Sequence, residues 1–129
     1  MSVHRVVPNI PVRTDSGPDG EAGAMRANAA FYGLLGFEEV MNQGWIMTLA
    51  SPSRPTAQVS VMTADKTAPV TPDMSVEVTD VDAVHAALVH AGAEIVYGPQ
   101  DEEWGVRRFF VRDPNGRVVN VLSHAASGR

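Results

Sequence analysis

Residues 104–122 read WGVRRFFVRDPNGRVVNVL and contain the strongest local structural signal in the 129-residue chain. Two runs rich in β-branched and aromatic residues, at 106–112 and 117–122, flank the DPNG tetrapeptide at 113–116. Proline fixes its own φ and glycine tolerates a positive φ, so this tetrapeptide favours a tight turn. The stretch therefore predicts a β-hairpin.

The residues before the hairpin predict a strand, a helix and a second strand. The alternation at 74–78 is typical of a strand, and Asp80 is placed to cap a helix over 81–91. A strand at 94–97 and a loop at 98–105 lead into the hairpin. The second half thus contains a strand, a helix and three further strands.

The first half of the chain repeats this plan. A strand is predicted at 4–12, and a loop at 13–23 precedes a helix at 24–35 that ends at a glycine. The strands predicted after it are 37–41, 45–50 and 57–63. Because the same order of elements occurs twice, the chain contains an internal repeat, and its predicted fold class is α+β.

Two motifs in opposite halves give the chain a family resemblance. FYGLLGF at 31–37 and the hairpin at 104–122 resemble signatures of the vicinal oxygen chelate superfamily, which includes glyoxalases, bleomycin-resistance proteins and extradiol dioxygenases. The resemblance covers nearly the whole chain. It implies a single domain with two βαβββ modules, at about 4–64 and 74–124, joined by a linker at 65–73. These modules would form a curved mixed sheet around a concave cavity, with the helices on the outer face.

Composition narrows the classes of function. The formal net charge of −5 argues against a nucleic-acid partner, which would require a basic surface. The chain contains no cysteine, so disulfides, thiolate metal sites and cysteine nucleophiles are excluded. No run is long and apolar enough to span a bilayer and no signal peptide is apparent, so we expect no membrane partner and a cytoplasmic location.

Alternation along the predicted strands sorts their side chains between two faces. The face expected to pack under the helices contains Val59, Val61, Val76, Val78, Val119 and Val121. The opposite face, expected to line the cavity, contains Gln58, Ser60, Ser75, Glu77 and Asn120. The predicted cavity is therefore polar.

The resemblance also implies where a metal would bind. Metal-dependent members hold one divalent ion with histidine and glutamate side chains, at positions that correspond to Val7, Gln58, Asp73 and Asn120. None of these is histidine or glutamate, and valine and amide groups are poor ligands for transition metals. The four histidines of the chain are interpreted as solvated surface residues. We therefore predict no metal and no other cofactor.

Glu77 is the predicted catalytic residue if the protein is an enzyme. A carboxylate in a partly apolar cavity can have its pKa raised and act as a general base. The alternative interpretation is a solvated carboxylate without a catalytic role.

The predicted ligand site combines flat apolar rings with hydrogen-bonding groups, as small-molecule pockets do. It comprises Trp45, Gln58, Ser60, Ser75, Trp104, Arg107, Phe109 and Asn120. Adjacent strand residues point to opposite faces, so only one of Phe109 and Phe110, and at most one of Arg107 and Arg108, can face the cavity. The acidic run at 101–103 beside Trp104 would favour a cationic guest.

These observations favour a metal-free binding protein that resembles the bleomycin-resistance branch of the superfamily. It would sequester an aromatic or cationic small molecule and so serve antibiotic resistance, and the resemblance implies a homodimer. The alternative is a superfamily enzyme, either a lyase, an isomerase or a dioxygenase-like protein. It would use Glu77, or a metal held by an unconventional pair such as Asp73 and Glu77.

Overall fold

The computed structural model describes residues 2–13, 20–65 and 67–124. These residues form an N-terminal unit, Val7–Lys66, and a C-terminal unit, in which Met1–Val6 joins Thr67–Arg129. Eight strands hydrogen-bond in the order β2-β3-β4-β1-β5-β8-β7-β6. Strand β1 (Val3–Pro11) contributes its first residues to the C-terminal unit and its last residues to the N-terminal unit.

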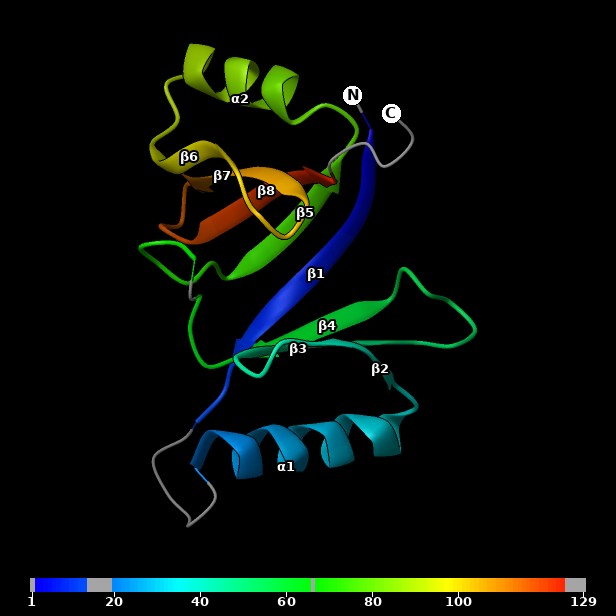
Figure 1. Ribbon diagram of the computed structural model, residues 1–129. Coiled ribbons are helices and arrows are strands. Elements are labelled where there is room, and N and C mark those ends of the chain that lie inside the picture. Colours follow the sequence, from blue (N-terminus) through cyan, green and yellow to red (C-terminus); the bar gives the residue numbers. More distant parts are fainter. Residues whose placement is uncertain (1, 14–19, 66, 125–129) are drawn as a thin grey trace. The chain divides into compact units, whose positions relative to one another are not determined.

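The N-terminal unit consists of a four-stranded sheet and one helix. Its elements after β1 are α1 (Gly20–Leu35), β2 (Glu38–Asn42), β3 (Ile46–Ala50) and β4 (Gln58–Met62). Strands β2, β3 and β4 are antiparallel neighbours, and β1 pairs with β4 in parallel. Helix α1 lies along one face of the sheet (Figure 1), where Met25, Met47, Leu49, Val59 and Val61 form the core.

The C-terminal unit repeats this arrangement. It contains β5 (Met74–Val78), α2 (Val81–His90), β6 (Ile95–Asp101), β7 (Val106–Arg112) and β8 (Val118–His124). Helix α2 packs against β6, β7 and β8, and it lies over this part of the sheet in Figure 1. The Asp80 carboxylate accepts a hydrogen bond from the Ala83 amide and caps α2, as predicted. The core beneath the helix contains Val78, Val81, Phe109, Val111 and Val121.

The predicted fold class is confirmed, because two helices and eight strands follow the order of tandem βαβββ modules. The predicted hairpin is formed by β7 and β8, and the Asp113 carboxylate accepts bonds from the amides of Asn115 and Arg117 in its turn. The valines expected under the helices all lie on the helix side. None of the helices in the described ranges is long and apolar enough to cross a bilayer.

Two predicted loops differ from the structure. The loop at 13–23 is shorter, because α1 begins at Gly20 and not at Ala24; residues 14–19 lie outside the described residues. The loop at 98–105 is also shorter, because β6 continues to Asp101. The Gly98-Pro99 pair concealed this extension: it lies within a register shift between Tyr97 and Gln100, and a bulge admits residues that ordinary strand positions disfavour.

Candidate functional site

The candidate site lies on the face of the C-terminal sheet opposite α2. In the register of β5 with β8, Ser75 lies beside Asn120, and Phe110 of β7 lies on the other side of Asn120. The Asn120 side chain donates through Nδ2 to Ser75 Oγ at 3.0 Å. Asn120 is only 4% exposed, and its Oδ1 is buried with no hydrogen-bond partner among the described residues. A buried acceptor without a partner costs about 1–3 kcal/mol, so this atom calls for an explanation.

Arg108, on the same face of β7, is the largest fully buried side chain of the described chain. Its Nε lies 2.6 Å from Glu102 Oε2, and its Nη2 donates to Thr67 Oγ1 at 2.8 Å. Its guanidinium carbon lies 4.9–5.7 Å from three aromatic ring centroids, those of Tyr97, Trp104 and Phe110. We call these three rings with Glu102 the aromatic cage. Burial is the main cause that raises the pKa of Tyr97, followed by the hydrogen bond that its hydroxyl donates to Glu102 at 2.9 Å.

The structure changes the interpretation of the acidic run at 101–103. Asp101 pairs with Arg107 at 3.3 Å, and Glu102 pairs with Arg108 inside the cage. Glu102 is therefore neutralised by Arg108, whereas Asp101 shares the charge of Arg107 with Asp82. The run is then a much weaker attraction for a cationic guest than its sequence suggested, since the field of a paired charge is largely cancelled.

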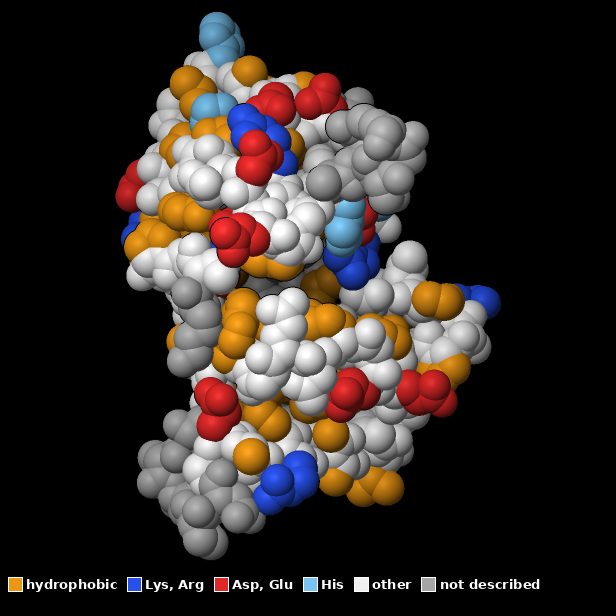
Figure 2. Space-filling model, viewed as in Figure 1, with side chains coloured by type: hydrophobic (Ala, Val, Ile, Leu, Met, Phe, Trp, Pro, Cys, Tyr) orange, Lys and Arg blue, Asp and Glu red, His pale blue; other side chains and the backbone are white. Residues whose placement is uncertain are grey.

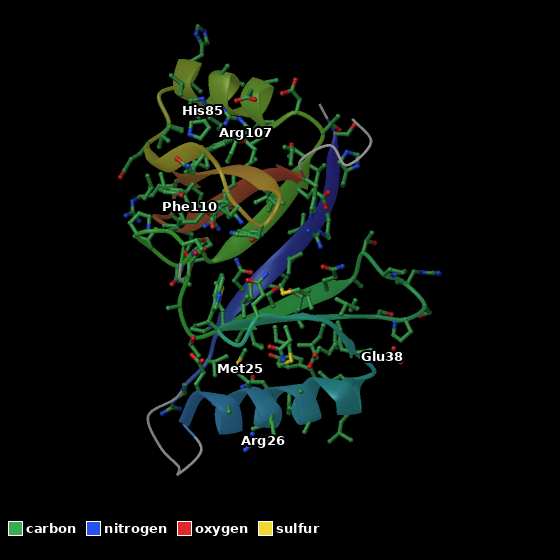
Figure 3. All side chains as sticks on the ribbon, viewed as in Figure 1. Met25, Arg26, Glu38, His85, Arg107 and Phe110 are labelled. Carbon is green, nitrogen blue, oxygen red and sulfur yellow. The ribbon has the colours of Figure 1, made fainter. Side chains whose placement is uncertain are left out.

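Phe109 and Arg107 lie on the helix side, not on the face of Asn120. Phe109 is fully buried in the core, where its ring meets His85 edge to face at 5.0 Å. Arg107 pairs with Asp82 of α2 at 3.0 Å. Figure 3 shows Arg107 on the side of the sheet that faces α2. Phe110 and Arg108 occupy the site face in their place, and we correct the candidate site accordingly.

A sequence signal for this orientation existed in the hairpin. The DPNG turn sets Arg112 opposite Val118, so that Phe110 falls opposite Asn120 and Phe109 opposite Val121. Counting residues from the turn therefore assigns Phe110 and Arg108 to the site face, and Phe109 and Arg107 to the helix side. No comparable sequence signal predicts that Tyr97 and Glu102 belong to the site. The register shifts of β6 against β7 determine where these two side chains lie.

Glu77 lies on the same face as Asn120 and is held by basic groups. Its Oε1 lies 3.0 Å from Arg5 Nε, and its Oε2 lies 3.0 Å from His124 Nδ1. We predicted that His124 is a solvated surface residue. Its side chain also contacts Glu77, the candidate general base. The pair resembles the arrangement in which a carboxylate orients an imidazole for proton transfer.

Three of the other predicted ligand residues belong to the N-terminal unit, whereas the aromatic cage belongs to the C-terminal unit. Trp45, Gln58 and Ser60 belong to the N-terminal unit, where Ser60 Oγ is 2.8 Å from Thr48 Oγ1 and Gln58 Nε2 donates to the Pro55 carbonyl at 2.9 Å. In the C-terminal unit Trp104 is 41% exposed, with its ring beside Arg108.

The four positions that the resemblance assigns to a metal do not carry the histidine and glutamate side chains expected of such a site. Val7 is apolar, Asn120 directs an N–H donor at Ser75, and Asp73 Oδ2 accepts the Val118 amide at 2.8 Å. Within the described ranges, no group of three or more histidine, aspartate or glutamate side chains is arranged to hold an ion. The donor set therefore gives no support for a family-type metal centre.

Comparison with known proteins identifies the family. The family model described as Glyoxalase/Bleomycin resistance protein/Dioxygenase superfamily matches residues 22–121. The chain therefore belongs to this superfamily, as the two sequence motifs indicated. No curated protein sequence matches the chain at a significant level.

Solved structures share the fold at low sequence identity. A superfamily member from Vibrio splendidus 12B01 is 15% identical with a TM-score of 0.63, over 95% of this chain and 99% of that chain. Methylmalonyl-CoA epimerase from Mycobacterium tuberculosis is 19% identical with a TM-score of 0.61, over 95% and 87%. The Mn(II)-bound glyoxalase from Novosphingobium aromaticivorans is 20% identical with a TM-score of 0.62, over 96% and 39%. At these identities the likeness concerns the fold alone.

Proposed function

We propose that this chain is a metal-independent binding protein for a planar small molecule that presents a hydrogen-bond donor. The observation that carries the proposal is the buried Oδ1 of Asn120, which has no partner among the described residues. A ligand N–H or O–H at this atom would remove the cost of the unpaired acceptor. Selectivity for such a donor can be large, because an analogue without it leaves the acceptor buried and unpaired.

The neighbouring residues support a flat ligand. Phe110, which is fully buried, lies beside Asn120 across the hairpin, and its ring centroid is 5.1 Å from that of Tyr97. The half-exposed indole of Trp104 offers a further flat surface on the same cage. Aromatic faces with one orienting polar group are the usual composition of a small-molecule site. A cationic ligand is also compatible with this site, since an ammonium group donates hydrogen bonds. The paired carboxylates of the acidic run, however, favour such a ligand only weakly.

Asn120→Leu is expected to separate binding from stability. Removal of the unpaired acceptor should leave the free energy of unfolding unchanged or raise it by about 1 kcal/mol. Binding should lose its preference for a donor. The test uses matched probes, indole with 1-methylindole and 4-aminoquinoline with 4-methylquinoline, followed by ¹H–¹⁵N spectra of the Asn120 side-chain amide. In the unmodified protein the donor member of each pair should bind about tenfold more tightly.

Ser75→Ala is the control, because it removes the partner of Asn120 Nδ2 and leaves Oδ1 in place. This variant should keep the preference for the donor probes. Equal affinity of the two members of each pair for the unmodified protein would refute the proposal. So would an Asn120→Leu variant that still prefers the donor.

A second candidate function, metal-free proton transfer, is favoured by the contact of Glu77 with His124. If the protein transfers protons, a bound probe with an acidic C–H group should exchange this hydrogen for deuterium in deuterated water. The exchange should be faster with the protein than in buffer alone. His124→Gln should abolish the acceleration while probe affinity is retained, because the amide cannot accept and return a proton. Retained exchange in this variant would exclude His124 as the proton acceptor.

A further inference from the structure

A large apolar groove lies on the helix side of the C-terminal unit, on the sheet face opposite Asn120. Its volume is about 880 Å³, within the range of small-molecule sites. The floor is formed by valines of β5 and β8, and one wall by Val84 and Leu88 of α2 and by Ala91, which follows the helix. Ser2 and Val3 contribute from the start of the chain. All lining residues belong to the C-terminal unit.

The groove exists because α2 is too short and too far to one side to cover the whole sheet. The helix has ten residues and packs mainly on β6, β7 and β8, so that β5 is buried at Val78 but not at Val76. Val76 and Val119 are consequently only partly buried, although they belong to the core face. Apolar surface of this extent favours an apolar occupant, because its burial releases water from both surfaces.

The mouth of the groove carries more negative than positive charge. It is formed by Glu94, Arg112 and Asp113, together with Pro114 and Gly116 of the hairpin turn. Arg112 is already engaged, through Nε with Glu94 at 3.2 Å and through Nη1 with the Gly116 carbonyl at 3.0 Å. Backbone hydrogen bonds, the first from the Arg117 amide, lower the pKa of Asp113, so this carboxylate stays ionised. Arg112 balances Glu94, which leaves the Asp113 carboxylate as the net charge of the groove lining and favours a cationic head group, in a chain of net charge −5. On the face shown in Figure 2, acidic side chains are scattered among the other residues.

We propose that this groove binds a lipophilic amine, with the hydrocarbon body between α2 and β5 and the ammonium at the mouth beside Asp113. The apolar lining selects a body without internal polar groups, since any such group would lose its hydrogen bonds to water. The mouth then selects the charge of the single head group. This site is independent of the proposed function at Asn120, because it lies on the other face of the sheet.

The test measures displacement of the apolar dye N-phenyl-1-naphthylamine by decylamine, decanol and decanoate, each below its micelle concentration. We expect decylamine to displace the dye best and decanoate worst. Glu94→Lys should reverse the order of the amine and the carboxylate, each affinity changing by about fivefold. Glu103→Lys is the matched control, since Glu103 is exposed and does not line the groove, and it should leave the order unchanged.

A second variant tests the location of the body. Ala91 is exposed and lines the groove, so Ala91→Phe places a ring inside the groove. Because the ring occupies part of the groove volume, the affinity for decylamine should fall by about tenfold or more. Ala86→Phe, on an exposed part of the same helix outside the groove, should have no effect. Asn120→Leu should also leave decylamine binding intact, which distinguishes a failure here from a failure at the Asn120 site.

Three outcomes would overturn the proposal. Decanoate could bind as tightly as decylamine, which would show that the charged residues at the mouth do not select the head group. Ala91→Phe could leave the affinity unchanged, which would place the alkyl chain elsewhere. Sedimentation could instead show a dimer that excludes the dye and that Ala91→Phe dissociates, which would assign the groove to a second copy of the chain.

Discussion

Replacing Arg108 with methionine is expected to lower the free energy of unfolding by about 3–5 kcal/mol, as observed when one member of a buried ion pair is removed. The substitution would leave Glu102, whose side chain is 8% exposed, without its cation, and among the described side chains the hydroxyl of Tyr97 would be its remaining hydrogen-bond partner. It would also remove the charge that the three rings of the aromatic cage surround. Urea unfolding followed by circular dichroism measures the loss.

Arg107→Met is the matched control one residue away. Arg107 also pairs with carboxylates, but those pairs are exposed, so we expect a loss of less than about 1 kcal/mol. The double variant Arg108→Met with Glu102→Gln should recover part of the loss, because a neutral amide costs less to bury than a carboxylate. A cost for Arg108→Met no greater than that for Arg107→Met would show that the cage does not depend on its buried charge.

Gly98→Ala is expected to destabilise the protein by about 2–4 kcal/mol, the sum of a positive φ and an overpacked contact. Gly98 has a φ of +77°, and a Cβ at this position would lie 2.6 Å from the Arg108 carbonyl oxygen and 3.2 Å from Phe109 Cα. The obstructing atoms are backbone, so they cannot move aside as a side chain would. Because the clash displaces the peptide of Arg108, we also expect a change in the fluorescence of Trp104 in the cage.

Gly105→Ala separates the two causes. Gly105 has a φ of +99°, but a Cβ there would meet nothing within 4 Å. Its cost should be only about 1–2 kcal/mol, from backbone conformation alone. Thermal and urea unfolding of both variants gives the comparison, and equal losses would show that the contact with the Arg108 carbonyl is unimportant.

The sequence by itself determined the repeat, the final hairpin and the sorting of valines to the helix side. Each depends on local rules: turn chemistry at 113–116, period-two alternation along strands, and a polar cap before a helix. The same rules placed Ser75 and Asn120 on the face opposite the helices, and the structure pairs them. The four positions that the resemblance assigns to a metal hold valine, glutamine, aspartate and asparagine, and the absence of a metal remains a prediction from these residue types.

Tertiary structure alone decided which charges are neutralised and which polar atom lacks a partner. The carboxylates of 101–103 seemed available in the sequence, but the long-range placement of Arg107 and Arg108 pairs two of them. Arg108 also meets Thr67, 41 residues earlier, a contact that no local pattern encodes. The missing partner of Asn120 and the groove beside α2 are likewise results of packing. A periodic pattern assigns a side chain to a face, but its partners depend on register shifts and on how far a helix extends over the sheet.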